Sequence, residues 1–138
     1  MEYKEAQDIK SLGEEIIKSL SMFHIMPRYV YFYRSKGSKS KNTIARIHGL
    51  GGIWYEVLGR PPIYIIEVIS ERYDKLSKEE KEKTLIHELL HIHKGFSGGF
   101  RPHKGYINKR LVEKLHKQLI ERRSFINTAT KNILDNYQ

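Results

Sequence analysis

Cysteine is absent from this chain of 138 residues, which excludes disulfide bonds and zinc sites built from thiolates. Any bound metal ion must therefore use histidine and carboxylate ligands. The sequence also lacks an apolar run near the roughly 18 residues that a membrane-spanning helix needs. Its first residues include Glu2, Glu5 and Asp8 rather than the positive charge of a secretory signal. We expect a cytoplasmic protein with no membrane partner.

Acidic residues are too few to balance the basic ones, and the formal net charge is +9. The excess lies in two blocks. Residues 28–60 hold seven Lys and Arg against one Glu, and residues 101–138 hold nine against three acidic residues. Such blocks are compatible with a nucleic-acid partner, and equally with a solubilising surface.

Hydrophobic periodicity and turn residues divide the chain into helices and strands. No βαβ alternation, repeat or linker is present, so we expect one α+β domain over residues 1–138. The predicted elements are a helix at about 6–23, strands at 28–34, 43–48 and 63–69, and helices beginning near Lys78 and Asn108.

The strand at 63–69 is the strongest of the three because it is almost entirely apolar. Pro61 and Pro62 precede it, and prolines favour the start of an edge strand over a central one. An exposed edge can pair with an extended peptide, so this strand is a candidate binding site for a peptide substrate.

The helix near Lys78 carries the most informative motif, His87-Glu88-Leu89-Leu90-His91. Histidines four residues apart share one helix face, and their imidazoles can hold one zinc ion. Glu88 lies about 100° around the axis, where it can reach a water molecule on that ion as general base. Ser77 begins a capping box, and Gly95 is a natural helix end. This context favours a metal site over a solvated face that carries two histidines by chance.

A catalytic zinc ion uses three protein ligands and keeps one position open for water. The best third candidate is His103, because the glycine-rich segment 95–107 can fold back beneath the helix. Glu113 and Glu121 on the last helix are alternatives, since sites with two histidines and one glutamate are also common. Arg101 and Tyr106 lie in the same loop and are candidate donors to the oxyanion of the transition state.

The remaining histidines give weaker signals. His93 lies on the wrong helix face to join His87 and His91. No spacing argument supports a ligand role for the others, which we interpret as ordinary structural or surface residues: His24, His48 and His116.

The segments HELLH, HKGFSGGFRPH and IYIIEVIS resemble the putative phage metallopeptidase family, a group of small zincins from phages and archaea, over roughly residues 28–107. The resemblance implies a minimal zincin-like domain with an N-terminal helix, a small twisted, mainly antiparallel sheet, an active-site helix and a long C-terminal helix. It also implies that His87, His91 and His103 bind zinc and that Glu88 is the general base. Metzincins fit less well because their third histidine follows more closely and a methionine turn comes later. SprT-like proteases are a looser match because this chain lacks their cysteine-rich zinc ribbon.

These observations predict a zinc-dependent metallopeptidase that acts on a peptide or protein substrate. The alternative is a basic nucleic-acid-binding protein, or a protease associated with DNA, in which zinc is structural or vestigial. Tyr29, Tyr31 and Tyr33 could stack on bases in that case, although one face of a sheet explains them equally well. Substrate, oligomeric state and any need for activation stay open.

Overall fold

The computed structural model describes residues 1–103 and 106–137 and has the expected α+β composition. None of the helices in these ranges is long and apolar enough to span a membrane. The elements in chain order are β1 (Glu2–Glu5), α1 (Gln7–Ser19), a 3-10 turn (Pro27–Tyr29), β2 (Val30–Lys36), β3 (Ala45–Leu50), α2 (Ile53–Leu58), β4 (Ile63–Ile69), α3 (Ser70–Tyr73), α4 (Lys78–Leu90) and α5 (Lys109–Asn136).

The strands form one four-stranded sheet with the order β1-β2-β4-β3. β1 with β2 and β3 with β4 are antiparallel, whereas β2 and β4 are parallel, so the sheet is mixed but mainly antiparallel. The edge position predicted for 63–69 is wrong, because β4 pairs with β2 on one side and with β3 on the other. Pro61 and Pro62 precede the ladder, so their missing N–H groups cost it nothing. The nearly continuous apolar sequence of β4 is typical of a central strand.

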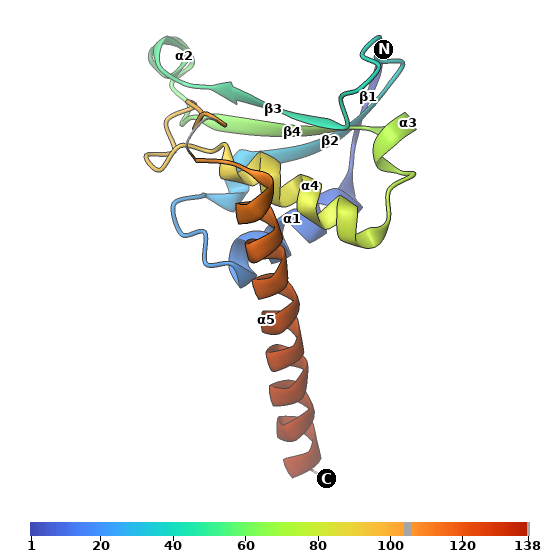
Figure 1. The fold of residues 1–138 in the computed structure, drawn as a ribbon. Helices are drawn as coiled ribbons and strands as arrows, with labels where there is room; N and C mark the ends of the chain where they lie inside the picture. The colour runs from blue at the N-terminus through green and yellow to red at the C-terminus, as the bar shows by residue number, and fades with distance from the viewer. Residues whose placement is uncertain (104–105, 138) are drawn as a thin grey trace.

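The helices α1 and α4 cover one face of the sheet, as Figure 1 shows. Phe32, Tyr64, Ile66 and Val68 point into this layer and are almost fully buried. A Cβ atom at Gly13 of α1 would lie 2.4 Å from the Phe32 ring, so only glycine lets this helix pack so closely on β2. The sheet and the two helices thus share one apolar core.

Capping side chains mark the beginning of the two helices α4 and α5. The Ser77 side chain accepts a hydrogen bond from the backbone N–H of Glu80 at 3.2 Å, and α4 begins at Lys78 as predicted. The Asn108 side chain caps α5 in the same way through Leu111 N–H at 2.8 Å. α4 ends at Leu90, earlier than the predicted Gly95, because the chain turns back immediately after the motif.

Four elements escaped prediction from the sequence: β1, the 3-10 turn at Pro27–Tyr29, α2 and α3. β1 is a short, exposed and mostly charged strand, so its pairing with β2 leaves no apolar pattern. α2 has no buried residues and lies at the end of the sheet where β3 ends and β4 begins (Figure 1). The predicted loop 95–107 contains no helix or strand where it is described, and its residues 104–105 lie outside the described ranges.

Candidate metal centre

The motif helix presents two imidazoles side by side at its C-terminal end. His87 and His91 are one turn apart, with ring centroids separated by 5.1 Å. His87 is half-buried, and His91 is buried where the helix ends. The spacing of four residues alone gives this arrangement, because such residues share one face of a helix.

The chain after α4 turns back along itself and brings a third histidine to this face. Ile92 and Phe100 form an isolated antiparallel bridge. The backbone N–H of Arg101 donates to the carbonyl of His91 at 2.8 Å. Two residues later the chain reaches His103, whose ring lies 4.4 Å from that of His91, centroid to centroid. A short hairpin-like return therefore closes a gap of twelve residues.

Tyr64 holds the segment from Ile92 to His103, which we call the return loop, against the sheet. Its hydroxyl donates to the carbonyl of Gly99 at 2.7 Å and accepts from the backbone N–H of Gly98 at 2.9 Å. Its ring is fully buried and packs edge-on against Phe96 and Phe100. One side chain of the central strand thus satisfies two backbone groups of the loop that carries His103.

Glycines on β3 and just after it make room for the same loop. A Cβ atom at Gly49 would lie 2.2 Å from the carbonyl oxygen of Gly98. At Gly51 it would lie 2.0 Å from the carbonyl oxygen of Ser97. Both approaches are closer than any side chain permits, so the loop lies on the backbone of the sheet.

Three imidazole nitrogens converge as a result. Nε2 of His103 lies 3.0 Å from Nε2 of His87 and 3.0 Å from Nε2 of His91. One nitrogen from each ring lies within 4.8 Å of the other two, and such a group could hold a metal ion. Ligands about 2.05 Å from a tetrahedral zinc ion are about 3.3 Å apart, so small ring rotations would accommodate one. The donor set and its spacing fit zinc.

Hydrogen bonding and burial favour the neutral form of two of these imidazoles. Nδ1 of His91 contacts the carbonyl oxygen of Arg101 at 2.9 Å. A carbonyl only accepts, so Nδ1 carries the proton and Nε2 keeps its lone pair for the centre. Burial lowers the pKa of His87, and the neighbouring imidazoles of His91 and His103 lower it further. Burial also lowers the pKa of His91. Both rings therefore favour the neutral form that binds metal.

Glu88 lies beside the three histidines but is not one of the grouped ligands. Its side chain is buried, and burial raises the pKa of its carboxyl group to about 7. Together with His87 it lines an open hollow between α4 and α5, which Lys109 also lines. A carboxyl group with a pKa near neutrality can both accept and release a proton.

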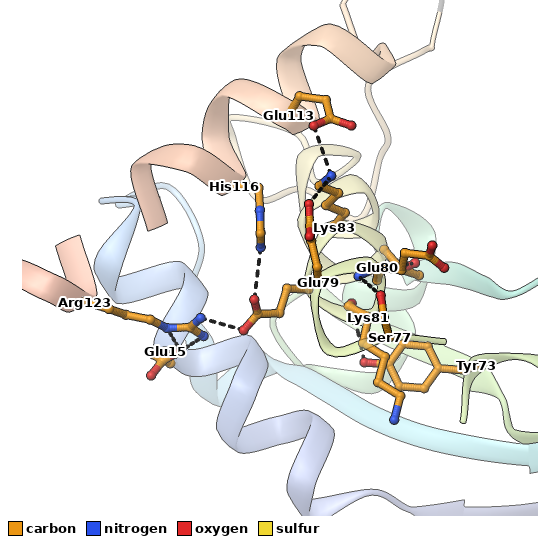
Figure 2. Close-up of polar contacts among 12 residues, drawn as sticks. Glu15, Tyr73, Ser77, Glu79, Glu80, Lys81, Lys83, Glu113, His116 and Arg123 are labelled. Atoms are coloured by element: carbon orange, nitrogen blue, oxygen red, sulfur yellow. Dashed lines mark hydrogen bonds and ion pairs between the residues drawn. The ribbon is translucent and has the colours of Figure 1, made fainter. Parts of the chain in front are cut away.

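The other predicted site residues lie outside the histidine group. The Arg101 guanidinium donates to the Tyr106 hydroxyl and lies 4.5 Å from the centre of its ring, so the two contact each other. Glu113 accepts from Lys83 at 3.0 Å, as Figure 2 shows, and Glu121 is exposed. Neither glutamate belongs to the histidine group.

The remaining histidines have other contacts. His116 of α5 contacts Glu82 of α4 at 3.0 Å, and both side chains are buried. His48 contacts Glu67 at 2.8 Å on the opposite face of the sheet from the helices. The Nδ1 atom of His93 accepts from the backbone N–H of Gly95, and burial lowers the pKa of His24.

Sequence reasoning missed the parts of the site that position the ligands. The Arg101 carbonyl belongs to the backbone and leaves no signal in the residue types. Tyr64 reads as an ordinary strand residue. Gly49 and Gly51 interrupt the sequence after the predicted strand 43–48, but a close approach to a loop about 50 residues away cannot be predicted from them.

The model of the family described as putative phage metallopeptidase matches residues 1–123. No curated protein and no solved structure matches the chain. The matched range includes the sheet, α4, the return loop and the first half of α5.

Proposed function

Because the chain belongs to the putative phage metallopeptidase family, we propose that it is a zinc-dependent peptidase that hydrolyses peptide bonds in protein substrates. The observation that carries the proposal is the convergence of His87, His91 and His103 beside a buried Glu88. The first two histidines and the glutamate come from one helical turn, and the third comes from the return loop. Three ligands leave the open position that hydrolysis requires.

In this proposal the three Nε2 atoms hold the metal, and Glu88 moves the proton. A bound zinc ion supplies Lewis acidity that lowers the pKa of a water molecule and polarises the scissile carbonyl. The Glu88 carboxylate accepts a proton from the attacking water and passes it to the leaving amine. Its pKa of about 7, raised by burial, suits both transfers near neutral pH.

A second donor would stabilise the oxyanion that forms on the substrate. Arg101 and Tyr106 are candidates because they lie in the loop that carries His103 and already contact each other. Lys109 is a further candidate, since it lines the same hollow as His87 and Glu88. Single substitutions of these residues should lower kcat more than they raise KM.

The surroundings of the centre favour a peptide as substrate. β3 is an edge strand that pairs only with β4 among the described strands, so it takes the place of β4 as the candidate strand for pairing with an extended chain. α2 follows directly and exposes bulky apolar side chains that could contact those of a substrate: Ile53, Trp54, Tyr55, Val57 and Leu58. An apolar surface of this kind suits polypeptide better than phosphate.

The test compares wild-type protein with Glu88→Gln and His103→Ala after loading with zinc. We expect about one zinc ion per chain in wild type and Glu88→Gln, and far less in His103→Ala. Cleavage of unfolded casein should fall at least about 100-fold in Glu88→Gln. Glu79→Gln, on the exposed first turn of the same helix and outside the hollow that Glu88 lines, is the matched control and should retain activity. Equal cleavage by wild type and Glu88→Gln would refute the mechanism.

Nucleic-acid binding is the second candidate. Several arginines of the basic blocks already form ion pairs within the protein, which leaves less charge for phosphates. Arg34 contacts Asp8 and Asp74, Arg46 contacts Glu67, and Arg123 contacts Glu82. Titration with duplex DNA at several salt concentrations tests it, because phosphate contacts give a steep salt dependence. No binding at low salt would exclude it.

A further inference from the structure

The second half of α5 extends beyond the body of the protein, as Figure 1 shows. Arg123 makes ion pairs to Glu15 of α1 and Glu82 of α4, and past this point the helix points away from the sheet. The projecting part, residues 124–137, exposes five large apolar side chains by half or more: Phe125 (73%), Ile126 (52%), Ile133 (57%), Leu134 (59%) and Tyr137 (86%). The family match ends at residue 123, where this projection begins.

The exposed side chains continue a stripe that is buried inside the body. Val112 and Leu119 belong to the core and are 6% and 0% exposed. Ile126 and Ile133 follow at the same spacing of seven residues, so all four lie on nearly one line along the helix. α1 and α4 cover the first two positions, and nothing among the described residues covers the last two. The projection therefore has the pattern of a helix that packs against another helix.

Charge restricts what can cover this stripe. Residues 124–137 contain one basic residue, Lys131, and one acidic residue, Asp135. Both lie about 140–180° around the helix from Ile126, on the opposite face. A neutral segment with an apolar face gives no electrostatic attraction to nucleic acid or an anionic membrane. An isolated helix of this length is also marginal in water, which favours a helical partner.

We propose that two copies of the chain associate through antiparallel pairing of residues 124–137, which are the end of α5 and its C-cap residue. The two-fold axis falls between Ala129 and Thr130, which places Ile126 of one copy against Ile133 of the other. The small residues at the centre allow the helices to approach closely. Because the projection points away from the body, antiparallel pairing places the two bodies at opposite ends without overlap. The two helix dipoles then point in opposite directions, which is the favourable arrangement.

The size of this contact sets the expected affinity. Fourteen residues span about 21 Å of helix. Five large apolar side chains per copy would cover roughly 1,000 Å² in total, at the lower limit for a specific interface. We therefore expect a dissociation constant in the micromolar range.

Sedimentation equilibrium of the full chain at about 1–200 µM tests the association. The average mass of wild type should rise from 16.3 kDa towards twice that value. The double variant Ile126→Glu, Ile133→Glu should weaken the dimer at least about 100-fold and stay monomeric. Ser124→Glu, Thr128→Glu changes the same charge on the opposite face and should dimerise like wild type. A monomeric wild type over the whole range would overturn the proposal, as would a double variant at 126 and 133 that dimerises.

Cross-linking tests the orientation, because a chain without cysteine accepts single engineered thiols cleanly. Ile126→Cys and Ile133→Cys proteins are mixed and oxidised under mild conditions. Antiparallel pairing predicts mainly the mixed disulfide between residues 126 and 133, whereas parallel pairing predicts the two homodimers. Predominant homodimers would refute the arrangement, and this readout is independent of whether the glutamate variants fold.

Discussion

Tyr64 connects the central strand to the loop that carries His103, so Tyr64→Phe tests how the site is built. The variant keeps the buried ring and its contacts with Phe96 and Phe100. It removes one hydrogen bond from Gly98 N–H and one to the Gly99 carbonyl, at 2.9 and 2.7 Å. Each bond contributes about 0.5–1.5 kcal/mol net, so we expect a loss of about 1–3 kcal/mol in the free energy of unfolding.

The same change should weaken metal binding, because the freed loop no longer holds His103 next to the other two imidazoles. Removal of groups that orient ligands typically costs about 10–100-fold in metal affinity. Urea unfolding of the metal-free protein measures the first effect, and zinc titration against a competing chelator measures the second. Tyr31→Phe is the control, since Tyr31 is 44% exposed on the opposite face of the sheet. Wild-type stability and zinc affinity in Tyr64→Phe would refute the proposed role of the hydroxyl.

Three further predictions concern stability and are measured by urea unfolding. Gly49→Ala places a Cβ 2.2 Å from the Gly98 carbonyl oxygen and should destabilise by about 1–3 kcal/mol or more, whereas Gly95→Ala, with its nearest contact at 3.4 Å, should change little. Glu82→Ala leaves the buried His116 and the half-buried Arg123 without their shared carboxylate and should cost about 3–5 kcal/mol; a loss no larger than that of the exposed Glu80→Ala would contradict this. Although burial raises the pKa of Glu67, the Arg46 guanidinium and the other hydrogen-bond partners, His48 among them, together outweigh this effect and lower that pKa to about 2. Because the pKa of Glu67 is lower in the folded than in the unfolded protein, the ionised carboxylate stabilises the fold above about pH 4.5, and this stabilisation is lost as pH falls towards 2. The free energy of unfolding of Glu67→Gln should therefore fall less steeply over that range. Identical acid profiles for the two proteins would refute the reasoning.

The Glu82 contacts show how the two helices behind the site are joined. His116 and Arg123 extend from α5 towards α4 in Figure 2, and their charged or polar ends meet one buried carboxylate. Arg123 lies 2.6 Å from Glu82 as an ion pair rather than as an aligned hydrogen bond. This contact anchors the first half of α5 beside α4, the helix that carries His87 and Glu88.

Much of the fold could be predicted because its signals are local. Ser77 and Asn108 cap α4 and α5 where the sequence indicates. The strands predicted at 28–34, 43–48 and 63–69 lie within two residues of β2, β3 and β4, the first and last from aromatic or β-branched runs and the second from alternation. The edge position predicted for β4 rested on Pro61 and Pro62, whereas its nearly continuous apolar sequence is the signal that indicates a central strand. β1 was missed because an exposed, charged strand leaves no apolar alternation.

The sequence by itself determined that His87, Glu88 and His91 share one turn of a helix, because the 3.6-residue period relates positions four apart without help from other elements. It also excluded thiolate ligands. Only the tertiary structure decided that His103, rather than Glu113 or Glu121, lies within the histidine group. That placement depends on the local Ile92–Phe100 bridge and on contacts of the loop with residues far away in the chain, namely the Tyr64 hydroxyl and the bare backbone at Gly49 and Gly51.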